Sequence, residues 1–355
     1  MTLKKATLLF SFFLLLLFFI LARLPGHNGD MPFYIACIIE TEQGSMQGVV
    51  EKTKEVLQNE LPSAEYQDHA ARFGSADPVI LERYRVKPLY IWMATAFHKL
   101  GFSYIHSTIL PSLLAYFLIG LSIWRILMKR LDPVKTFLLS TGCMLIYPTL
   151  LLARLSTPDA ISCLFLLNAI SLIYNGGNKM LWYILFILAI CTRIDNVVSE
   201  LIFLFALWRW PVTGFLNKLT TKHFVGLSFG LIGMGLLVNL VATHHFLWFM
   251  NPAFSLPPGQ YLKDVGLYFY VFPGSFFMYL LMFFIISAFS RGFSWKKEVN
   301  YLFYAVCFIV AVRFLLYPFY EERYIAPWLL FCLLSISFSY AGLGNRLTRI
   351  PGKGV

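Results

Sequence analysis

Acidic and basic side chains lie beside long apolar runs at several places in this sequence. In "ARLSTPDAISCLFLL", residues 153–167, Arg154 and Asp159 flank a stretch that is apolar enough to enter a membrane. A carboxylate at a membrane edge can act as a general base toward a hydroxyl group, and lysine or arginine at the same depth can hold a phosphate. The stretch also has a purely structural explanation. Thr157 would be a helix N-cap, Pro158 would occupy the first helical position, and Asp159 would face the positive end of the helix dipole.

The rest of the chain predicts a protein with many membrane-spanning helices. Of its 355 residues, 58% are hydrophobic and only 13% are charged, and long apolar segments recur from end to end. The net charge of +11 does not indicate a nucleic-acid partner, because the basic residues fall in short clusters between apolar runs. The six cysteines form no close-spaced metal or redox motif. We therefore predict an all-α integral membrane protein that contacts the lipid bilayer and binds no nucleic acid.

About ten transmembrane helices are expected. The first covers residues 6–22, which exceed the core of a usual signal peptide and lack a small-residue cleavage site, so we expect this span to be retained. The others are expected near residues 107–127, 134–155, 158–175, 179–193, 195–208, 223–243, 267–290, 299–318 and 324–343. We find no internal repeat and no linker. The sequence therefore predicts one membrane-embedded domain, which consists of a first span (1–23), a long loop (24–106), a multi-span bundle (107–343) and a tail (344–355).

The distribution of charge predicts the orientation of the chain. If the N-terminus is cytoplasmic, the inner connections hold most of the lysines and arginines, whereas the short outer connections hold Arg154, Arg193, Lys263 and Arg323. Both termini then lie in the cytoplasm. More than half of the acidic residues fall in the outer loop, residues 24–106. The chain has no N-glycosylation sequon, which favours a bacterial source, so we expect the inner membrane with this loop in the periplasm.

Two short helices are expected within the loop. The segment "MQGVVEKTKEVLQNEL" predicts a helix that is ended by Pro62. The segment "KPLYIWMATAFHKLG" is apolar and aromatic but too short to cross about 30 Å of hydrocarbon. Its Tyr90 and Trp92 are typical of a helix that lies at the outer membrane interface.

Most of the other polar residues near the spans fall on the same outer side of the membrane. These residues are Asp30, Arg85, Lys87, Arg154, Asp159, Arg193, Asp195, His244, His245, Glu321, Glu322 and Arg323. Arg193 and Asp195 are equally well explained by pairing with each other. Glu200 and Arg313 lie deeper, where an ionisable group costs roughly 2.5–3.5 kcal/mol, so we expect each to be paired or to face an internal cavity. The clustering of the outer residues, rather than any one of them, favours a functional site.

Five short segments resemble motifs of the GT-C glycosyltransferases. The similarity is closest to the lipid-phosphate-sugar-dependent enzymes, such as the bacterial aminoarabinose and protein mannosyl transferases. "GDMPFY", after the first span, matches the first-loop catalytic acid with Asp30, and "VKPLYIW" resembles the KP…YW segment with Lys87. The remaining segments are "ARLSTPDA" with Asp159, "EERYIAPWLL" with Arg323 and, more loosely, "TRIDN" with Arg193. The order of one span, a long outer loop and a multi-span bundle extends the resemblance over most of the chain.

This resemblance implies inverting transfer of a sugar from a polyprenyl-phosphate donor to a glycan, lipid or protein acceptor in the cell envelope. Asp30 would deprotonate the acceptor hydroxyl. Asp159 would orient the site or, together with Asp30, help to hold a divalent metal ion, which some family members need and others do not. The basic residues implied in binding the leaving phosphate are Lys87, Arg323, Arg193 and Arg85.

Three other functions stay open. One is a flippase or transporter of lipid-linked sugars, although such proteins often contain repeated halves that this chain lacks. A second is a polysaccharide polymerase or ligase, in which the major loop usually comes late in the chain. A third is a protein that has kept the GT-C-like fold without the chemistry. Met31 keeps this third possibility open, because many family members carry a second acid at its position. Val86 argues against a metal site like that of the aminoarabinose enzymes, because those enzymes carry a glutamate at its position.

Overall fold

The computed structural model describes residues 1–74, 78–129, 131–174, 177–209 and 219–243, and the single positions 263, 309 and 330. Over these residues the regular structure is helical, as predicted, with one isolated β-bridge. In chain order the helices are α1 (Leu3–Arg23), α2 (Met31–Gln43), α3 (Val49–Glu60), α4 (Ser63–Gly74), the 3-10 helix η1 (Pro78–Leu81), α5 (Glu82–Arg85), α6 (Pro88–Lys99), α7 (Tyr104–Met128), α8 (Pro133–Leu145), α9 (Tyr147–Arg154), α10 (Asp159–Tyr174), α11 (Lys179–Thr192), α12 (Asn196–Arg209) and α13 (Thr221–Thr243).

Three of these helices are long and apolar enough to cross a membrane, namely α1, α7 and α13, with 21, 25 and 23 residues. The pair α8 and α9 would form a fourth span, but it is bent by 61° at a break. Helices α10, α11 and α12 have 16, 14 and 14 residues. At a rise of 1.5 Å per residue they extend about 21–24 Å, which is less than the hydrocarbon core of about 30 Å. The chain therefore has the helices of a membrane protein, but the prediction of about ten spans is wrong for the described residues.

The break between α8 and α9 has a local cause. Ile146 adopts an extended conformation with φ −64° and ψ 140°, and Pro148 lies in the first turn of α9, where its missing N–H removes no helical hydrogen bond. Hydropathy alone merges these two helices into one span, because the residues around the break are themselves apolar. The spans predicted at 267–290, 299–318 and 324–343 lie outside the described residues.

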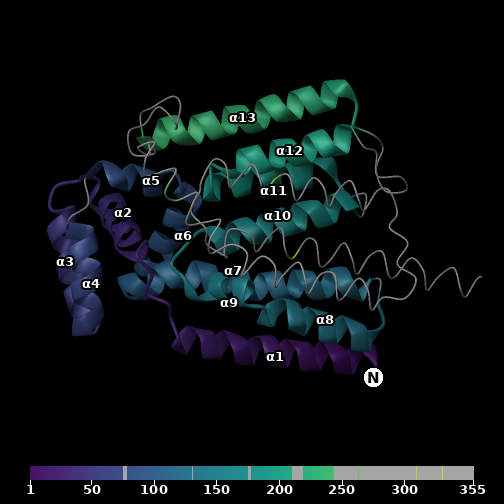
Figure 1. Ribbon diagram of the computed structural model, residues 1–355, viewed down its shortest axis with the longest axis horizontal. Helices are drawn as coiled ribbons and strands as arrows, with labels where there is room; N and C mark the ends of the chain where they lie inside the picture. The colour runs from purple at the N-terminus through teal and green to yellow at the C-terminus, as the bar shows by residue number, and fades with distance from the viewer. Residues whose placement is uncertain are drawn as a thin grey trace, which may run out of the picture.

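The long helices run alongside one another, and the short helices of the 24–106 segment gather at one end of them (Figure 1). That end is the one at which α1 finishes, away from the N-terminus. We call α2, α3, α4, η1 and α5 the cap. The two helices predicted in this segment are confirmed as α3 and α6. The cap is fixed to the bundle by Glu60 of α3, whose carboxylate accepts hydrogen bonds from the backbone N–H groups of Tyr104 and Ile105 at 3.1 and 3.0 Å and so caps the start of α7.

Two apolar clusters hold the long helices together. One joins α1 to α7 and α8–α10, with Phe10 stacked on Trp124 at 4.7 Å between ring centroids. Gly120 allows the close approach of α1 and α7, since a Cβ atom there would lie 2.7 Å from a methyl group of Leu14. The other cluster joins α10 to α11, α12 and α13. A third cluster forms the interior of the cap and reaches the start of α7.

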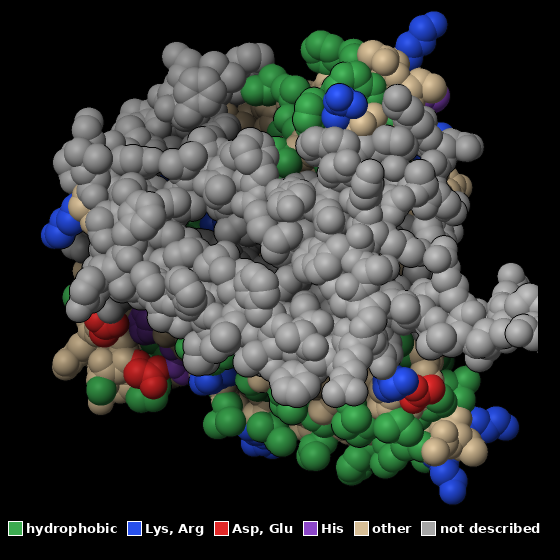
Figure 2. All heavy atoms as spheres, turned by 45° about the vertical axis from the view of Figure 1, so that its right-hand side comes forward, with side chains coloured by type: hydrophobic (Ala, Val, Ile, Leu, Met, Phe, Trp, Pro, Cys, Tyr) green, Lys and Arg blue, Asp and Glu red, His purple; other side chains and the backbone are tan. Residues whose placement is uncertain are grey.

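The exposed side chains differ between the two ends of the molecule. Figure 2 shows hydrophobic side chains gathered along the lower edge and acidic side chains at the lower left. The hydrophobic side chains of α1 include Leu8, Phe12 and Phe19, each at least 64% exposed. In α6, Trp92 is 64% exposed, whereas Tyr90 is fully buried and donates a hydrogen bond to the Thr108 carbonyl at 2.5 Å. Of the two aromatic residues predicted for the membrane interface, only Trp92 therefore faces outward.

Candidate functional site

The segment after α1 pairs with the segment before α10. Gly26 N–H donates to the Arg154 carbonyl at 2.9 Å, and Ser156 N–H donates to the side-chain oxygen of Asn28 at 3.2 Å. A Cβ atom at Gly26 would lie 3.0 Å from a methyl group of Leu155, so the two segments meet closely. This pairing brings the start of α2, which follows Asp30, beside the start of α10, which begins at Asp159.

Asp30 precedes α2 and is bound by a tyrosine of the cap. Its side chain makes no capping hydrogen bond to α2. Instead, the Tyr84 hydroxyl donates a hydrogen bond to Asp30 Oδ1 at 2.9 Å. This hydrogen bond fixes the orientation of the Asp30 carboxyl, and a general base must be positioned in this way.

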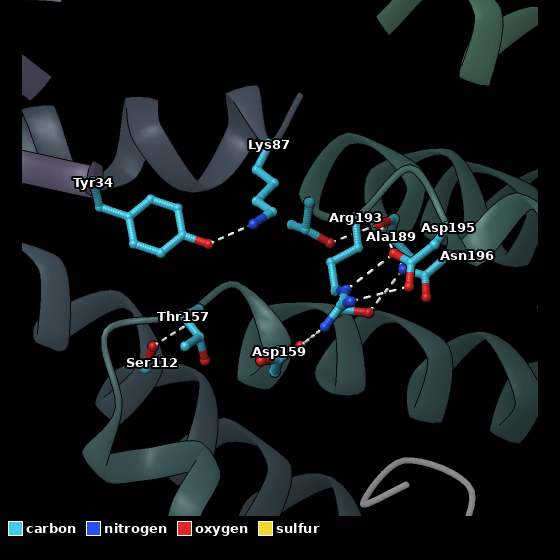
Figure 3. Close-up of polar contacts among 11 residues, drawn as sticks. Tyr34, Lys87, Ser112, Thr157, Asp159, Ala189, Arg193, Asp195 and Asn196 are labelled. Atoms are coloured by element: carbon cyan, nitrogen blue, oxygen red, sulfur yellow. Dashed lines mark hydrogen bonds and ion pairs between the residues drawn. The ribbon is translucent and has the colours of Figure 1, made fainter. Parts of the chain in front are cut away.

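Lys87 lies next to the same tyrosine, at the N-cap position of α6. Its Nζ donates to the Tyr34 hydroxyl at 2.8 Å (Figure 3) and lies 4.6 Å from the centre of the Tyr84 ring and 5.1 Å from that of Tyr34. The two rings therefore hold the ammonium group by cation–π attraction as well as by a hydrogen bond. Tyr84 contacts both Asp30 and Lys87, so the predicted acid and the predicted cation lie in one cluster.

Tyr34 connects this cluster to the start of α10. Its side chain is fully buried, and burial raises the pKa of its hydroxyl well above the ordinary value, with a further contribution from the charge of Asp30. Asp159 also lies close enough for its charge to raise the pKa of this hydroxyl. Tyr34 therefore keeps its proton and lies in a region where the fields of the two predicted acids overlap.

Asp159 is almost fully buried and binds an arginine from the turn between α11 and α12. Arg193 contacts Asp159 through Nη1 and donates to both carboxylate oxygens of Asp195 at 3.0 Å (Figure 3). The pairing of Arg193 with Asp195 that the sequence suggested is therefore present. One guanidinium group neutralises two carboxylates here, which compensates for the burial of Asp159.

The contacts at the start of α10 differ from the helix cap that the sequence predicted. Helix α10 begins at Asp159, one residue later than predicted. The Thr157 hydroxyl, predicted as the N-cap, is buried and makes no hydrogen bond to any described residue. The Thr157 carbonyl instead accepts from the Ser112 hydroxyl at 2.7 Å, which ties this connection to α7. Asp159 lies in the first turn of α10, where the helix dipole favours an acid as predicted, and it also pairs with Arg193, whereas the Thr157 side chain makes no cap.

Arg85, predicted as a phosphate contact, forms an ion pair within the cap. Its Nε and Nη2 atoms each lie 2.9 Å from a carboxylate oxygen of Glu40, in the two-point geometry that arginine and carboxylate favour. Arg85 therefore links α5 to α2, and a phosphate would have to compete with Glu40 for it. Arg323, Arg313, His244, His245, Glu321 and Glu322 lie outside the described residues.

The two acids proposed for a divalent metal do not fit a shared metal site. Asp30 faces a donating hydroxyl, and Asp159 faces a guanidinium group that would repel a cation. No group of three or more His, Cys, Asp or Glu side chains within the described ranges has the spacing of a metal site. His27, which the sequence places three residues before Asp30, is paired with Glu65 of α4.

Tyr34 and Tyr84 are the site residues that sequence reasoning missed. Tyr34 follows Asp30 by four residues at the start of a helix, and Tyr84 precedes Lys87 by three. Such spacings place side chains on one side of a helical turn and could have drawn attention to both tyrosines. Comparison of the chain with models of protein families, with curated proteins and with solved structures finds no match. The site is therefore interpreted from its residues and their geometry.

Proposed function

We propose that this chain is an inverting glycosyltransferase of the bacterial inner membrane, with a polyprenyl-phosphate sugar as donor and an envelope molecule as acceptor. The observation that supports this function best is the cluster of Asp30, Tyr84 and Lys87. A base and a cation are held there by one tyrosine, at the end of apolar helices. These are the two groups that sugar transfer from a lipid phosphate requires.

In the proposed reaction, Asp30 accepts the proton of the acceptor hydroxyl as its oxygen attacks the anomeric carbon. A new carbon–oxygen bond forms on one face of the sugar, while the bond to the phosphate oxygen breaks on the other face. The polyprenyl phosphate leaves with the bonding electrons. Positioned general bases contribute about 10²- to 10⁴-fold to such steps. The hydrogen bond from the Tyr84 hydroxyl keeps the Asp30 carboxyl oriented before the attack.

Lys87 is the proposed contact for the leaving phosphate. Its ammonium group donates a hydrogen bond to the Tyr34 hydroxyl and lies close to the Tyr34 and Tyr84 rings, which hold its position. One well-placed donor to a developing negative charge contributes about 3–4 kcal/mol of transition-state stabilisation. Arg323 remains a proposed second phosphate contact, on the strength of the sequence motif.

Asp159 and Arg193 have a positioning role in this proposal. Arg193 is already bound by two carboxylates, so it is a weaker candidate for the phosphate than Lys87. Its pairing with Asp159 joins the start of α10 to the α11–α12 turn, and the segment before α10 pairs with the residues that lead to Asp30. The cap would then cover the site and select the acceptor, with both termini in the cytoplasm.

Deletion of the gene and complementation with variants tests this function. We expect the deletion strain to accumulate a polyprenyl-phosphate sugar at the outer face and to lose one envelope modification, both measured by mass spectrometry. The wild-type gene should restore the modification, whereas Asp30→Asn should not. Glu55→Gln is the matched control, because Glu55 is an exposed acid on α3. Full complementation by Asp30→Asn would refute the role of this acid. Accumulation of the lipid-linked sugar at the inner face would instead indicate a flippase.

A further inference from the structure

A second acidic group lies buried away from the site described above. Glu200 is on α12 and has no exposed surface. Neither of its carboxylate oxygens has a hydrogen-bond partner among the residues that the structure describes. Within the part of the chain that the structure describes, no lysine or arginine forms an ion pair with it. A carboxylate in such surroundings would lack both water and a counter-charge, which proteins avoid by neutralising the group.

Asn196 presents a second unsatisfied acceptor one helical turn before Glu200. Its amide nitrogen donates to the Ser162 hydroxyl and to the Ala189 carbonyl, each at 2.8 Å. Because a carbonyl can only accept, the bond to Ala189 fixes which end of the amide is the nitrogen. The amide oxygen is buried and has no hydrogen-bond partner in the described part of the chain. Residues four apart on a helix lie on the same face, so the side chains of Asn196 and Glu200 share one face of α12.

Among the described residues, no positively charged side chain near this pair neutralises a charge on Glu200. The ionisable groups near enough to interact electrostatically with Glu200 are Asp195 at the start of α12, and Tyr183 and Cys191 on α11. Each of these would be negative when ionised. On α13, residues 224–243 contain no ionisable side chain, and this helix packs closely on α12 where Gly235 meets Val197. All the unsatisfied atoms of the pair are acceptors, so what they need is a hydrogen-bond donor.

We propose that Glu200 and Asn196 form a proton-binding site, in which Glu200 is a neutral carboxylic acid whose O–H is directed at the Asn196 amide oxygen. One bound proton then satisfies the amide oxygen and removes the charge from the buried carboxyl. The site is separate from the proposed transfer reaction, so it stands or falls independently of it.

A buried, protonated carboxyl is also a site for covalent modification by hydrophobic carbodiimides, which partition into apolar surroundings. In this reaction the carboxyl proton passes to a carbodiimide nitrogen, and a carboxyl oxygen bonds to the central carbon. Migration of the acyl group to nitrogen then gives a stable N-acylurea that keeps every atom of both reactants. An ionised carboxylate does not carry the proton that this step needs.

The test uses the full chain, purified in detergent at neutral pH. We expect dicyclohexylcarbodiimide to label Glu200, as located by mass spectrometry of peptides, more than about tenfold faster than exposed Glu55. An exposed glutamate with a pKa of about 4.3 is protonated in only roughly one molecule in five hundred at neutral pH. The infrared spectrum should also contain the carbonyl stretch of a protonated carboxyl. That band should be lost in Glu200→Gln and kept in Glu55→Gln.

Two results would overturn the proposal. One is labelling of Glu200 no faster than that of Glu55, which requires only the wild-type chain and so does not depend on the folding of any variant. The other is an infrared spectrum in which no protonated-carboxyl band depends on Glu200. A neutral glutamine should also leave the melting temperature unchanged or raise it, because glutamine replaces the neutral acid closely. A different pair of results would point to a bound cation in place of the proton. These are a large fall in the melting temperature of Glu200→Gln and a wild-type melting temperature that rises when sodium ions are added.

Discussion

Tyr84 donates a hydrogen bond to Asp30 at 2.9 Å, and the ring of the same residue lies under the ammonium group of Lys87 at 4.6 Å. The two interactions use different parts of one side chain, since the hydroxyl binds the acid and the π face binds the cation. They can therefore be separated by mutation.

Tyr84→Phe should lower sugar transfer while it leaves the position of Lys87 unchanged. The ring remains, but Asp30 loses a hydrogen bond that, to a charged group, contributes about 1.5–3 kcal/mol, equivalent to roughly a 10- to 100-fold change in rate. Initial rates of polyprenyl-phosphate release in proteoliposomes would measure this. Tyr104→Phe is the matched control, because the Tyr104 hydroxyl donates to Glu42 at 3.0 Å away from the site. Equal activity of both variants would contradict the proposed role of Tyr84.

Removal of Arg193 should be more damaging than removal of Arg193 and Asp159 together. Arg193→Gln leaves the almost fully buried Asp159 without its guanidinium partner, and breaking a buried ion pair in this way costs about 3–5 kcal/mol. The double variant Arg193→Gln with Asp159→Asn should regain much of that stability. Thermal unfolding of the two variants and of Asp159→Asn completes a double-mutant cycle. Strictly additive effects would show that the pair is not coupled.

Gly26→Ala should destabilise the pairing of the first loop with the α9–α10 connection. The added Cβ atom would lie 3.0 Å from a Leu155 methyl group and 3.3 Å from the Arg154 carbonyl, so these groups must give way by a few tenths of an ångström. Overpacking of this kind costs about 1–3 kcal/mol. Gly142→Ala in α8 is the control, since nothing lies within 4 Å of its new Cβ atom and alanine favours helix. We expect a lower melting temperature for Gly26→Ala alone, and equal shifts in both variants would argue against the close contact.

Cys37 should resist thiol reagents until the cap unfolds. Burial raises the pKa of its thiol to about 12, and the charge of Glu40 adds to the shift. The reactive thiolate forms only as the pH rises toward that value, so the folded protein at neutral pH holds Cys37 as a buried thiol. Maleimide labelling followed by peptide mass spectrometry should find Cys37 unmodified in the native protein and modified in urea. Rapid native labelling would show that α2 is accessible.

The sequence predicts the positions of the helices better than which of them can cross a membrane. Helix α3, which Pro62 ends, and helix α6 are predicted correctly because such signals are local, whereas α2 and α4 are not predicted. The bounds of α10–α12 are predicted to within one residue, but these helices are too short for the spans expected of them. The break at Ile146 is missed, because hydropathy does not register where backbone hydrogen bonding stops. Similarly, the pairing of Arg193 with Asp195 follows from neighbouring residues, whereas its contact with Asp159 depends on how α10 packs on α11. Tyr84 is missed because its role depends on two partners that only the fold brings together.

The pairing near Gly26 also has a consequence for how the protein is made. The Arg154 side chain reaches back 130 residues to the Leu24 carbonyl, and Arg193 comes later still. During translation, the residues around Asp30 therefore leave the ribosome long before their partners exist. Until α11 has been inserted, the residues between α1 and α2 lack the segments of the chain with which they later pair. Chains that terminate before that point would reach the membrane without the contacts that join the start of α2 to the start of α10.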